Sequence, residues 1–332
     1  MKKIASLIAY CLLPIAYCLL CAWGTWGHHH INKSAVLALP DTIGTFFYNH
    51  IDFITEESVS PDLRKYAIQD KAESPRHFFD MENYGKNMDS VPKLSKPAYA
   101  AYDEKFLSKN GSLPWVIQDI EDRLTKAFKD KNKSEILYLA ANLGHYIADA
   151  HMPLHTTNNY DGQMTNQKGI HAFWESQLPE LYGDKYNFYT GPPQYINDLS
   201  SETWRIIQNS HNLMEPMLEA DKKLTERFPK ENLYKKDSTG ALIKNNFKQP
   251  IHTNEYASQY HEALKGMVES QMRGAISETA NFWYTAWVNA GRPDLRDLDA
   301  KSLTKRNKKW YRKDVKAWKE GHITNLKADT EY

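Results

Sequence analysis

Cysteine is scarce in this sequence of 332 residues, and its three cysteines, Cys11, Cys18 and Cys21, all lie near the start. Disulfides and thiol chemistry are therefore excluded for the rest of the chain. An excess of charge is lacking too, because 42 Lys and Arg residues face 41 Asp and Glu residues. Nothing in this balance indicates bulk attraction to a polyanion.

Long apolar runs are also few, and the mean hydropathy is -0.66. With 41% apolar and 12% aromatic residues, this composition excludes a disordered chain, a collagen and a polytopic membrane protein. Alternating strand patterns between hairpin turns are scarce. Because the length lies near the upper limit for one core, we expect a single domain of the all-α class.

The one apolar run begins at Ile4, after two lysines, and ends at Leu20, shortly before the small residue Ala22. This order is typical of a secretory signal peptide. We expect it to span residues 1–22 and to be cleaved before Trp23. The mature protein is therefore predicted to be secreted or periplasmic.

Two other fates for this N-terminal segment are less favoured. A membrane anchor is disfavoured because the run is short, contains Pro14 and is followed by polar sequence. Lipoprotein anchoring at Cys21 is disfavoured because Leu20 occupies a position where lipoprotein signals usually have a small residue.

Helical spacing of apolar residues dominates the remaining sequence. Three long helices and two long loops are predicted. The first helix follows Ser112 as its N-cap, the second follows Ser134 as its N-cap, and the third spans residues 256–290, whereas the loops span residues 156–169 and 229–253.

The C-terminal segment alternates cations with Trp310, Tyr311 and Trp318. Such a segment can grip nucleic acid or an anionic surface. A partly helical tail that packs on the domain through its tryptophans is the favoured interpretation. We therefore expect a domain over residues 23–297 and a basic, aromatic-containing tail over residues 298–332.

The sharpest functional signal lies in the second predicted helix. His145 and Asp149 are four residues apart, so their side chains share one face, which lies away from the apolar stripe. His155 follows, and then a second pair at the same spacing, His171 and Glu175. Imidazole and carboxylate groups in this arrangement suit zinc. One pair alone is usually a solvated contact, but two pairs and another histidine favour a metal centre.

Further candidate ligands lie upstream. Asp62 and His77 add a carboxylate and an imidazole. After the expected cleavage, the α-amine and carbonyl of Trp23 and the ring of His28 could converge on one ion. The glycines between them would permit the tight backbone path that this requires.

In its order and spacing, this set of residues resembles the trinuclear-zinc superfamily that joins bacterial phospholipase C to the single-strand-specific nucleases with 3′-nucleotidase activity. The resemblance covers residues 23 to about 290 and implies a mainly helical single domain with three Zn²⁺. The ligands that it implies are Trp23, His28 and Asp149 for one zinc; Asp62, His77, His145 and the shared Asp149 for the second; and His155, His171 and Glu175 for the third.

The resemblance implies a zinc-dependent phosphodiester hydrolase, and charge arithmetic agrees with it. Three Zn²⁺ bring more positive charge than three carboxylates neutralise, which suits a phosphate. A water between two zincs loses a proton near neutral pH and attacks as a zinc-bound hydroxide, while the third ion stabilises the leaving oxygen. We expect a secreted nuclease and 3′-nucleotidase acting on single-stranded nucleic acid or nucleotides, and no obligate protein partner is implied.

Two alternatives remain open. The spacings of the N-terminal ligands look like those of the nucleases, but Glu175 stands where those nucleases generally have Asp, and the loop before His171 is shorter than theirs. A zinc-dependent phospholipase C acting on phospholipid headgroups is therefore the alternative. A non-catalytic zinc protein is less favoured, because structural zinc sites are usually closed by four protein ligands.

The resemblance also implies roles beside the metals. Asp62 and Lys65 would be catalytic, with Lys65 as a cation that stabilises the transition state, although an exposed lysine is an equally common outcome. Phe78 would stack on a nucleobase, although a packed core phenylalanine is commoner. Three nearby residues are interpreted as structural polar groups: Arg64, Arg76 and Asp80.

Overall fold

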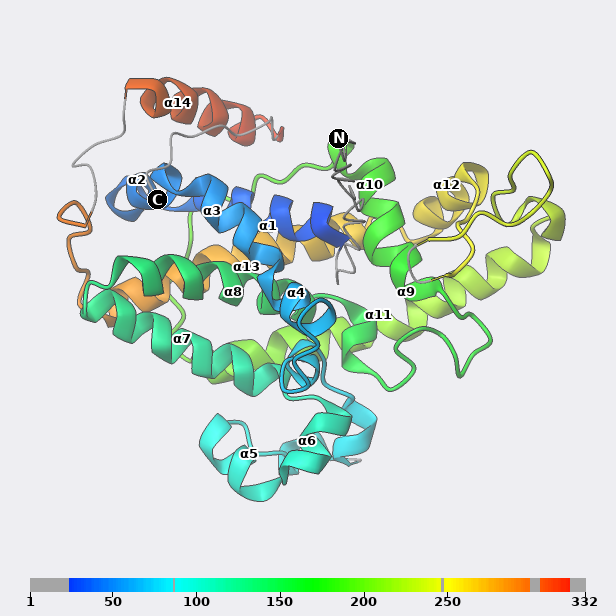
Figure 1. Cartoon of the computed structure of the whole chain (residues 1–332), viewed down its shortest axis with the longest axis horizontal. Helices are drawn as coiled ribbons and strands as arrows, with labels where there is room; N and C mark the ends of the chain where they lie inside the picture. Colours follow the sequence, from blue (N-terminus) through cyan, green and yellow to red (C-terminus); the bar gives the residue numbers. More distant parts are fainter. Residues whose placement is uncertain (1–23, 86, 246–247, 299–304, 323–332) are drawn as a thin grey trace, which may run out of the picture.

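The computed structural model describes residues 24–85, 87–245, 248–298 and 305–322, and it is almost entirely helical (Figure 1). The predicted all-α class is confirmed. The signal peptide, Trp23 and the end of the tail lie outside the described residues. The α-helices are α1 (Gly24–Ala38), α2 (Asp41–Asn49), α3 (Ile51–Glu56), α4 (Ser60–Tyr66), α5 (Ser95–Ala101), α6 (Glu104–Asn110), α7 (Leu113–Lys129), α8 (Lys133–Ala150), α9 (Ile170–Ala172), α10 (Leu178–Tyr182), α11 (Leu199–Arg227), α12 (Asn254–Ala263), α13 (Met267–Asn289) and α14 (Lys305–Lys319).

Short helical turns join several of these helices. The 3₁₀ turns near the predicted ligands are η1 (Glu57–Val59), η2 (Ser74–His77) and η5 (Pro153–Thr156), and a π-helical turn, η6, spans Phe173–Gln177. Single-turn π-helices are frequently found at functional sites.

The first two predicted helices are present as α7 and α8; the predicted N-cap position of α7 is confirmed, whereas that of α8 is wrong. Ser112 is the N-cap residue of α7, but its hydroxyl donates to the carbonyl oxygen of Pro75 at 3.3 Å and makes no capping bond. Asn132 replaces Ser134 as the cap of α8, since its side-chain oxygen accepts a bond from the backbone N–H of Glu135. An asparagine cap is as favourable as a serine cap, and the helix begins at Lys133, two residues earlier than a cap at Ser134 would place its start.

The helix predicted over residues 256–290 is two helices, α12 and α13. Lys265 and Gly266 between them have φ angles of 51° and 80°. This left-handed pair ends α12, and glycine adopts such angles without steric cost. The apolar spacing continues across the break, which is why the sequence pattern suggested one helix.

The centre of the molecule is formed by α1, α7, α8 and α13, which pack against one another. Figure 1 shows α8 and α13 running side by side beneath α1. The indole of Trp283 in α13 donates to the carbonyl oxygen of Ala140 in α8 at 2.9 Å and stacks on Phe47 at 5.1 Å. Burial of such large side chains fixes α8 in the core.

The polar face of α8 is buried as well. Asn142, His145 and Asp149 are each at most 3% exposed, because η1, η2, α1 and α4 pack against this face. Burying polar groups at the centre of a domain is costly unless they are paired or bind a metal. The polar face of α8 therefore marks the candidate site.

The described part of the tail forms α14, which packs against α1 and α2. Asp314 accepts a bond from the hydroxyl of Tyr48 at 2.5 Å, and the buried indole of Trp318 donates to the carbonyl oxygen of Phe188 at 3.0 Å. Residues 157–169, 233–245 and 248–253 are loops apart from isolated bridges. Within the described ranges, no helix is both long enough and apolar enough to cross a bilayer.

Candidate metal centre

Several separate segments deliver the predicted ligands to one place. His28 comes from α1, Asp62 from α4, His77 from η2, and His145 and Asp149 from α8. These five side chains are at most 1% exposed. On the other side of Asp149, η5 supplies His155, the helix α9 supplies His171, and the π-helical turn η6 supplies Glu175. The structure thus brings together every predicted ligand that it describes.

Asp62, His77 and His145 form the first group, whose ligand atoms all lie within 4.8 Å of one another. His77 Nδ1 is 3.6 Å from Asp62 Oδ1, 3.1 Å from His145 Nε2 and 2.9 Å from Asp149 Oδ2. Ligands bound tetrahedrally to zinc at about 2.0–2.2 Å lie roughly 3.3–3.6 Å apart. The spacing therefore fits one zinc ion among these side chains.

His28 joins His145 and Asp149 in a second group. Its ring stacks on that of His145 at 4.0 Å, and its Nε2 lies 3.6 Å from Asp149 Oδ1. Neither ring nitrogen of His28 has a hydrogen-bond partner among the described residues. A buried polar group of this kind calls for an explanation, and a bound metal is one.

His155, His171 and Glu175 form the third group. The Nε2 atoms of the two histidines face each other at 3.2 Å, and His171 Nε2 lies 3.0 Å from Glu175 Oε1. Glu175 is buried and His171 is half-buried. A cation between the two imidazoles and the carboxylate would satisfy all three.

Two hydrogen bonds orient the imidazoles. His145 Nδ1 lies 2.8 Å from the carbonyl oxygen of Ser58, and His171 Nδ1 lies 2.6 Å from that of Tyr160. A carbonyl oxygen only accepts hydrogen bonds, so each of these two histidines carries its proton on Nδ1. The Nε2 atom of each ring then has a free lone pair, which faces the other ligands. Burial lowers the pKa of His145 to about 3, which keeps the ring in the neutral form that a metal needs.

Asp149 lies at the centre of the three groups. Its Oδ2 faces His77 and His145, whereas its Oδ1 lies 3.6 Å from both His28 Nε2 and His155 Nδ1. Burial raises the pKa of Asp149 to about 6, against the effect of the hydrogen bond to His77. A carboxylate with four imidazoles around it is suited to bridge two cations.

A cavity of ≈ 460 Å³ is lined by four of these ligands: His77, His155, His171 and Glu175. Both residues that were predicted to act beside the metals line it: Lys65 and Phe78. Phe78 is half-buried, whereas the adjacent Phe79 is fully buried and stacks on Tyr84 at 4.1 Å. The core position in this pair is therefore Phe79, and Phe78 presents its ring to the cavity.

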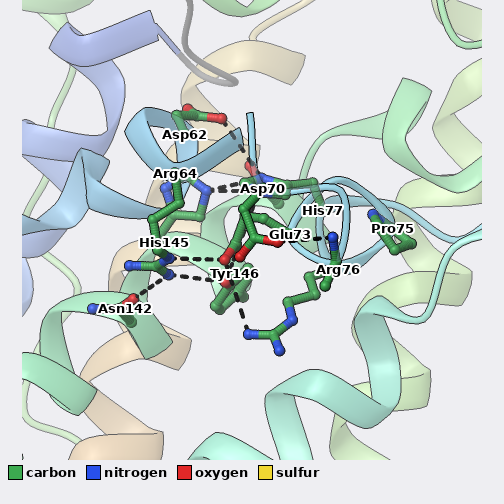
Figure 2. Close-up of polar contacts among 12 residues, drawn as sticks. Asp62, Arg64, Asp70, Glu73, Pro75, Arg76, His77, Asn142, His145 and Tyr146 are labelled. Carbon is green, nitrogen blue, oxygen red and sulfur yellow. Dashed lines mark hydrogen bonds and ion pairs between the residues drawn. The ribbon is translucent and has the colours of Figure 1, made fainter. Parts of the chain in front are cut away.

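Asp80, interpreted from the sequence as structural, also lines the cavity. Burial, together with the nearby carboxylate of Glu82, raises its pKa to about 7. Arg64 and Arg76 do not line the cavity. They lie instead around Glu73, a buried carboxylate that the sequence analysis did not single out (Figure 2).

Glu73 could have been found from its spacing. It precedes His77 by four residues, as His145 precedes Asp149 and His171 precedes Glu175. Its Oε1 lies 3.4 Å from His77 Nε2. Burial alone would raise the pKa of Glu73, but contacts with His77 and Arg64 hold it well below its usual range, so the group is ionised.

Comparison with known proteins agrees with this geometry. Nuclease S1 of Aspergillus oryzae is 25% identical over 197 residues, which cover 53% of this chain and 63% of that protein. The alignment thus spans less than two thirds of the length of that relative. The family model for S1/P1 nuclease matches residues 23–276. This family is zinc-dependent and falls within the superfamily predicted from the sequence, which confirms that prediction. Because the match covers most of its length, the chain belongs to the S1/P1 nuclease family.

Proposed function

We propose that this protein is a zinc-dependent nuclease and 3′-nucleotidase that acts on single-stranded nucleic acid and nucleotides. One observation carries the proposal. Three adjoining groups of imidazoles and carboxylates are spaced as zinc ligands are. Two of these groups reach a cavity that Lys65 and Phe78 also line, through His77, His155, His171 and Glu175. The family to which the chain belongs supports the nuclease over the phospholipase alternative.

Three zinc ions would be held by the nine predicted ligands. Trp23 would add its α-amine and carbonyl beside His28 and Asp149, although it lies outside the described part of the chain. When bound, the ions supply Lewis acidity for the phosphate and lower the pKa of a coordinated water toward neutrality. Asp149, with one oxygen toward each pair of histidines, fits the shared ligand.

The chain's own side chains would bind and orient the substrate. The ammonium group of Lys65 provides a positive charge at the cavity wall, where it can contact the phosphate as negative charge grows in the transition state. The ring of Phe78 offers a flat apolar surface for an unpaired base. Paired bases would first have to unstack, so single strands are favoured.

We further propose that residues 1–22 are a signal peptide, that the enzyme is secreted or periplasmic, and that the domain spans residues 23–297. Families of this kind are typically secreted. We assign the basic helix α14 of the tail no role in the reaction, because its buried residues pack it against α1 and α2.

The experiment is a substrate panel on the zinc-loaded protein, with metal analysis of the same sample. We expect close to three zincs per chain and release of nucleotides from single-stranded DNA and RNA faster than from duplex. Asp149→Asn should lose at least one zinc together with activity. Release of phosphocholine from lipid vesicles without cleavage of oligonucleotides would assign the protein to lipid hydrolysis, and one zinc or none after loading would contradict the trinuclear site.

A further inference from the structure

A buried carboxylate lies behind the candidate metal centre. Glu73 is 1% exposed, and Figure 2 shows it between Arg64, Tyr146 and His77. Its Oε2 accepts a bond from Arg64 Nε at 2.8 Å, and its Oε1 accepts one from the hydroxyl of Tyr146. Arg76 approaches Oε2 at 3.9 Å from the outer side. A buried carboxylate with this many donors is firmly held in place.

The contacts of Glu73 reach every segment that supplies a ligand to the first metal group. Arg64 follows Asp62 by two residues in α4, and Tyr146 directly follows His145 in α8. Glu73 itself precedes His77 in the segment that ends as η2.

Arg64 strengthens the connection between these segments. Its guanidinium also donates to Asn142 Oδ1 of α8 at 2.7 Å and to the hydroxyl of Tyr138 at 2.9 Å. One ion pair, Arg64 with Glu73, therefore connects α4, η2 and α8 behind the ligands.

Glu73 also faces the ring nitrogen of His77 that points away from the ligands. His77 Nδ1 faces Asp62, His145 and Asp149, whereas Nε2 lies 3.4 Å from Glu73 Oε1. Nε2 makes no hydrogen bond of regular geometry among the described residues, and Glu73 is the carboxylate that lies within ion-pair distance of it. Metal-binding histidines usually donate their second ring N–H to a carboxylate or carbonyl, and such partners tune metal affinity.

We propose that Glu73 is a positioning residue for the metal centre. Its carboxylate takes the Nε2–H of His77 and so fixes Nδ1 as the atom that binds the ion. Its bonds to Arg64 and Tyr146 hold the neighbouring ligands at their spacing. This inference rests on the metal centre of the proposed function and deepens it, since it assigns a role to a residue outside the nine ligands.

The test compares zinc release from the full-length holo protein and three variants: Glu73→Ala, Glu73→Gln and Glu121→Gln. Zinc passing to an excess of a colorimetric chelator is followed with time. We expect Glu73→Ala to release one of the three zincs about 10- to 100-fold faster than wild type, the usual effect of losing such a partner. Glu73→Gln keeps an acceptor oxygen without its charge, and it should release that zinc severalfold faster.

Glu121→Gln is the matched control, because Glu121 is also a buried carboxylate (2% exposed) but lies in α7 with Thr125 as its partner. Circular dichroism shows whether each variant is folded. If Glu73→Ala does not fold, Glu73→Gln carries the comparison. Release at the rate of the Glu121→Gln control from a folded Glu73 variant would overturn the proposal.

The ¹⁵N spectrum of labelled histidines adds a readout that a loss of stability would not mimic. In the wild-type holo protein, His77 should show a protonated Nε2 whose hydrogen exchanges slowly, and this signal should broaden or vanish in Glu73→Ala. A wild-type His77 protonated at Nδ1 would also overturn the proposal. Wild-type protein that binds no zinc would contradict the metal centre itself, whereas three zincs with unchanged release in the variants would contradict only the role of Glu73.

Discussion

The side-chain oxygen of Asn32 occupies the space that a side chain at Gly144 would need. A Cβ on Gly144 would lie 2.1 Å from that oxygen, while the Asn32 amide donates to the carbonyl oxygens of Ile54 and Ala141 at 3.1 Å each. Helices α1 and α8 therefore meet at a glycine. Their close approach lets the ring of His28, one turn before Asn32, stack on the ring of His145.

Gly144→Ala tests this relationship. The added methyl group must displace an asparagine that is held by two buried bonds, so we expect a loss of about 1–3 kcal/mol in the free energy of unfolding. Zinc bound through His28 should be lost before the other zincs. Thermal unfolding and zinc analysis measure both effects.

The double variant Asn32→Ala with Gly144→Ala is the control, because it removes the obstructing oxygen. It should be less destabilised than the sum of the two single variants. Strict additivity would show that the two residues do not interact as the structure indicates.

Lys65→Met should reduce turnover and leave the metal in place. Lys65 lines the cavity but is not among the ligand groups, so we expect zinc content to be unchanged. Loss of one transition-state contact should lower kcat about 100-fold, with a much smaller change in KM. Lys71→Met, at an exposed lysine of a nearby turn, is the matched control. Equal kinetics for the two variants would leave Lys65 as an ordinary cavity lysine.

Sequence spacing found the ligand pairs within helices, because four residues in a helix return a side chain to the same face. His145 with Asp149 and His171 with Glu175 follow this rule, and the family pattern added the more distant ligands. Glu73 and His77 share that spacing, yet the meaning of Glu73 depends on Arg64 and Tyr146 from other segments. Such long-range contacts cannot be read from local spacing.

The fold shows the same division between local and long-range signals. Apolar periodicity predicted α7 and α8 and the mainly helical class. It missed the break between α12 and α13, because the apolar stripe continues past the left-handed Gly266. The choice between Phe78 and Phe79 as the core residue also depended on tertiary packing, against Tyr84 and Trp115.

Phe78→Ala should weaken substrate binding without affecting the metal. Stacking on an aromatic side chain contributes about 1–3 kcal/mol per base, so KM for single-stranded oligonucleotides should rise roughly tenfold or more. Zinc content should stay the same, because Phe78 is not a ligand. A small phosphodiester that carries no base is the control substrate, and its KM should not change. An equal rise for both substrates would mean that the variant distorts the site.

Glu121→Gln should stabilise the protein at alkaline pH. Burial raises the pKa of Glu121 to about 7 from an ordinary value of 4.5, so the folded state holds this proton more tightly than the unfolded state does. The stability of the wild type should then fall as pH rises between about 4.5 and 7. The variant has no carboxyl group at this position and does not lose this stability. Its free energy of unfolding minus that of the wild type should therefore be roughly 2–3 kcal/mol larger at pH 8 than at pH 5.

Urea unfolding at the two pH values measures the difference between each variant and wild type. Glu226→Gln, at an exposed carboxylate of α11, is the control for the loss of a carboxylate at the surface. A constant difference for Glu121→Gln would mean that folding does not raise the pKa of Glu121.

The last prediction concerns Trp23 and the N-terminus that cleavage would create. The adjoining Gly24 lies against Ser176, where a Cβ on the glycine would be 3.0 Å from the serine Oγ. The start of α1 therefore lies beside η6, which supplies Glu175. One turn further, His28 directs toward Asp149 a ring nitrogen that has no hydrogen-bond partner among the described residues. A free α-amine at Trp23 would complete the ligand set around that nitrogen.

A residue placed before Trp23 converts this amine into an amide, whose nitrogen has no lone pair available for a metal. A form that retains a methionine before Trp23 should therefore bind one zinc fewer, or bind it more weakly, and should turn over more slowly than the processed form. Removal of the extra residue by an aminopeptidase should restore both zinc content and turnover, which separates this effect from misfolding. Equal zinc content and equal rates for the two forms would show that the α-amine is not a ligand and that His28 and Asp149 bind their ion without it.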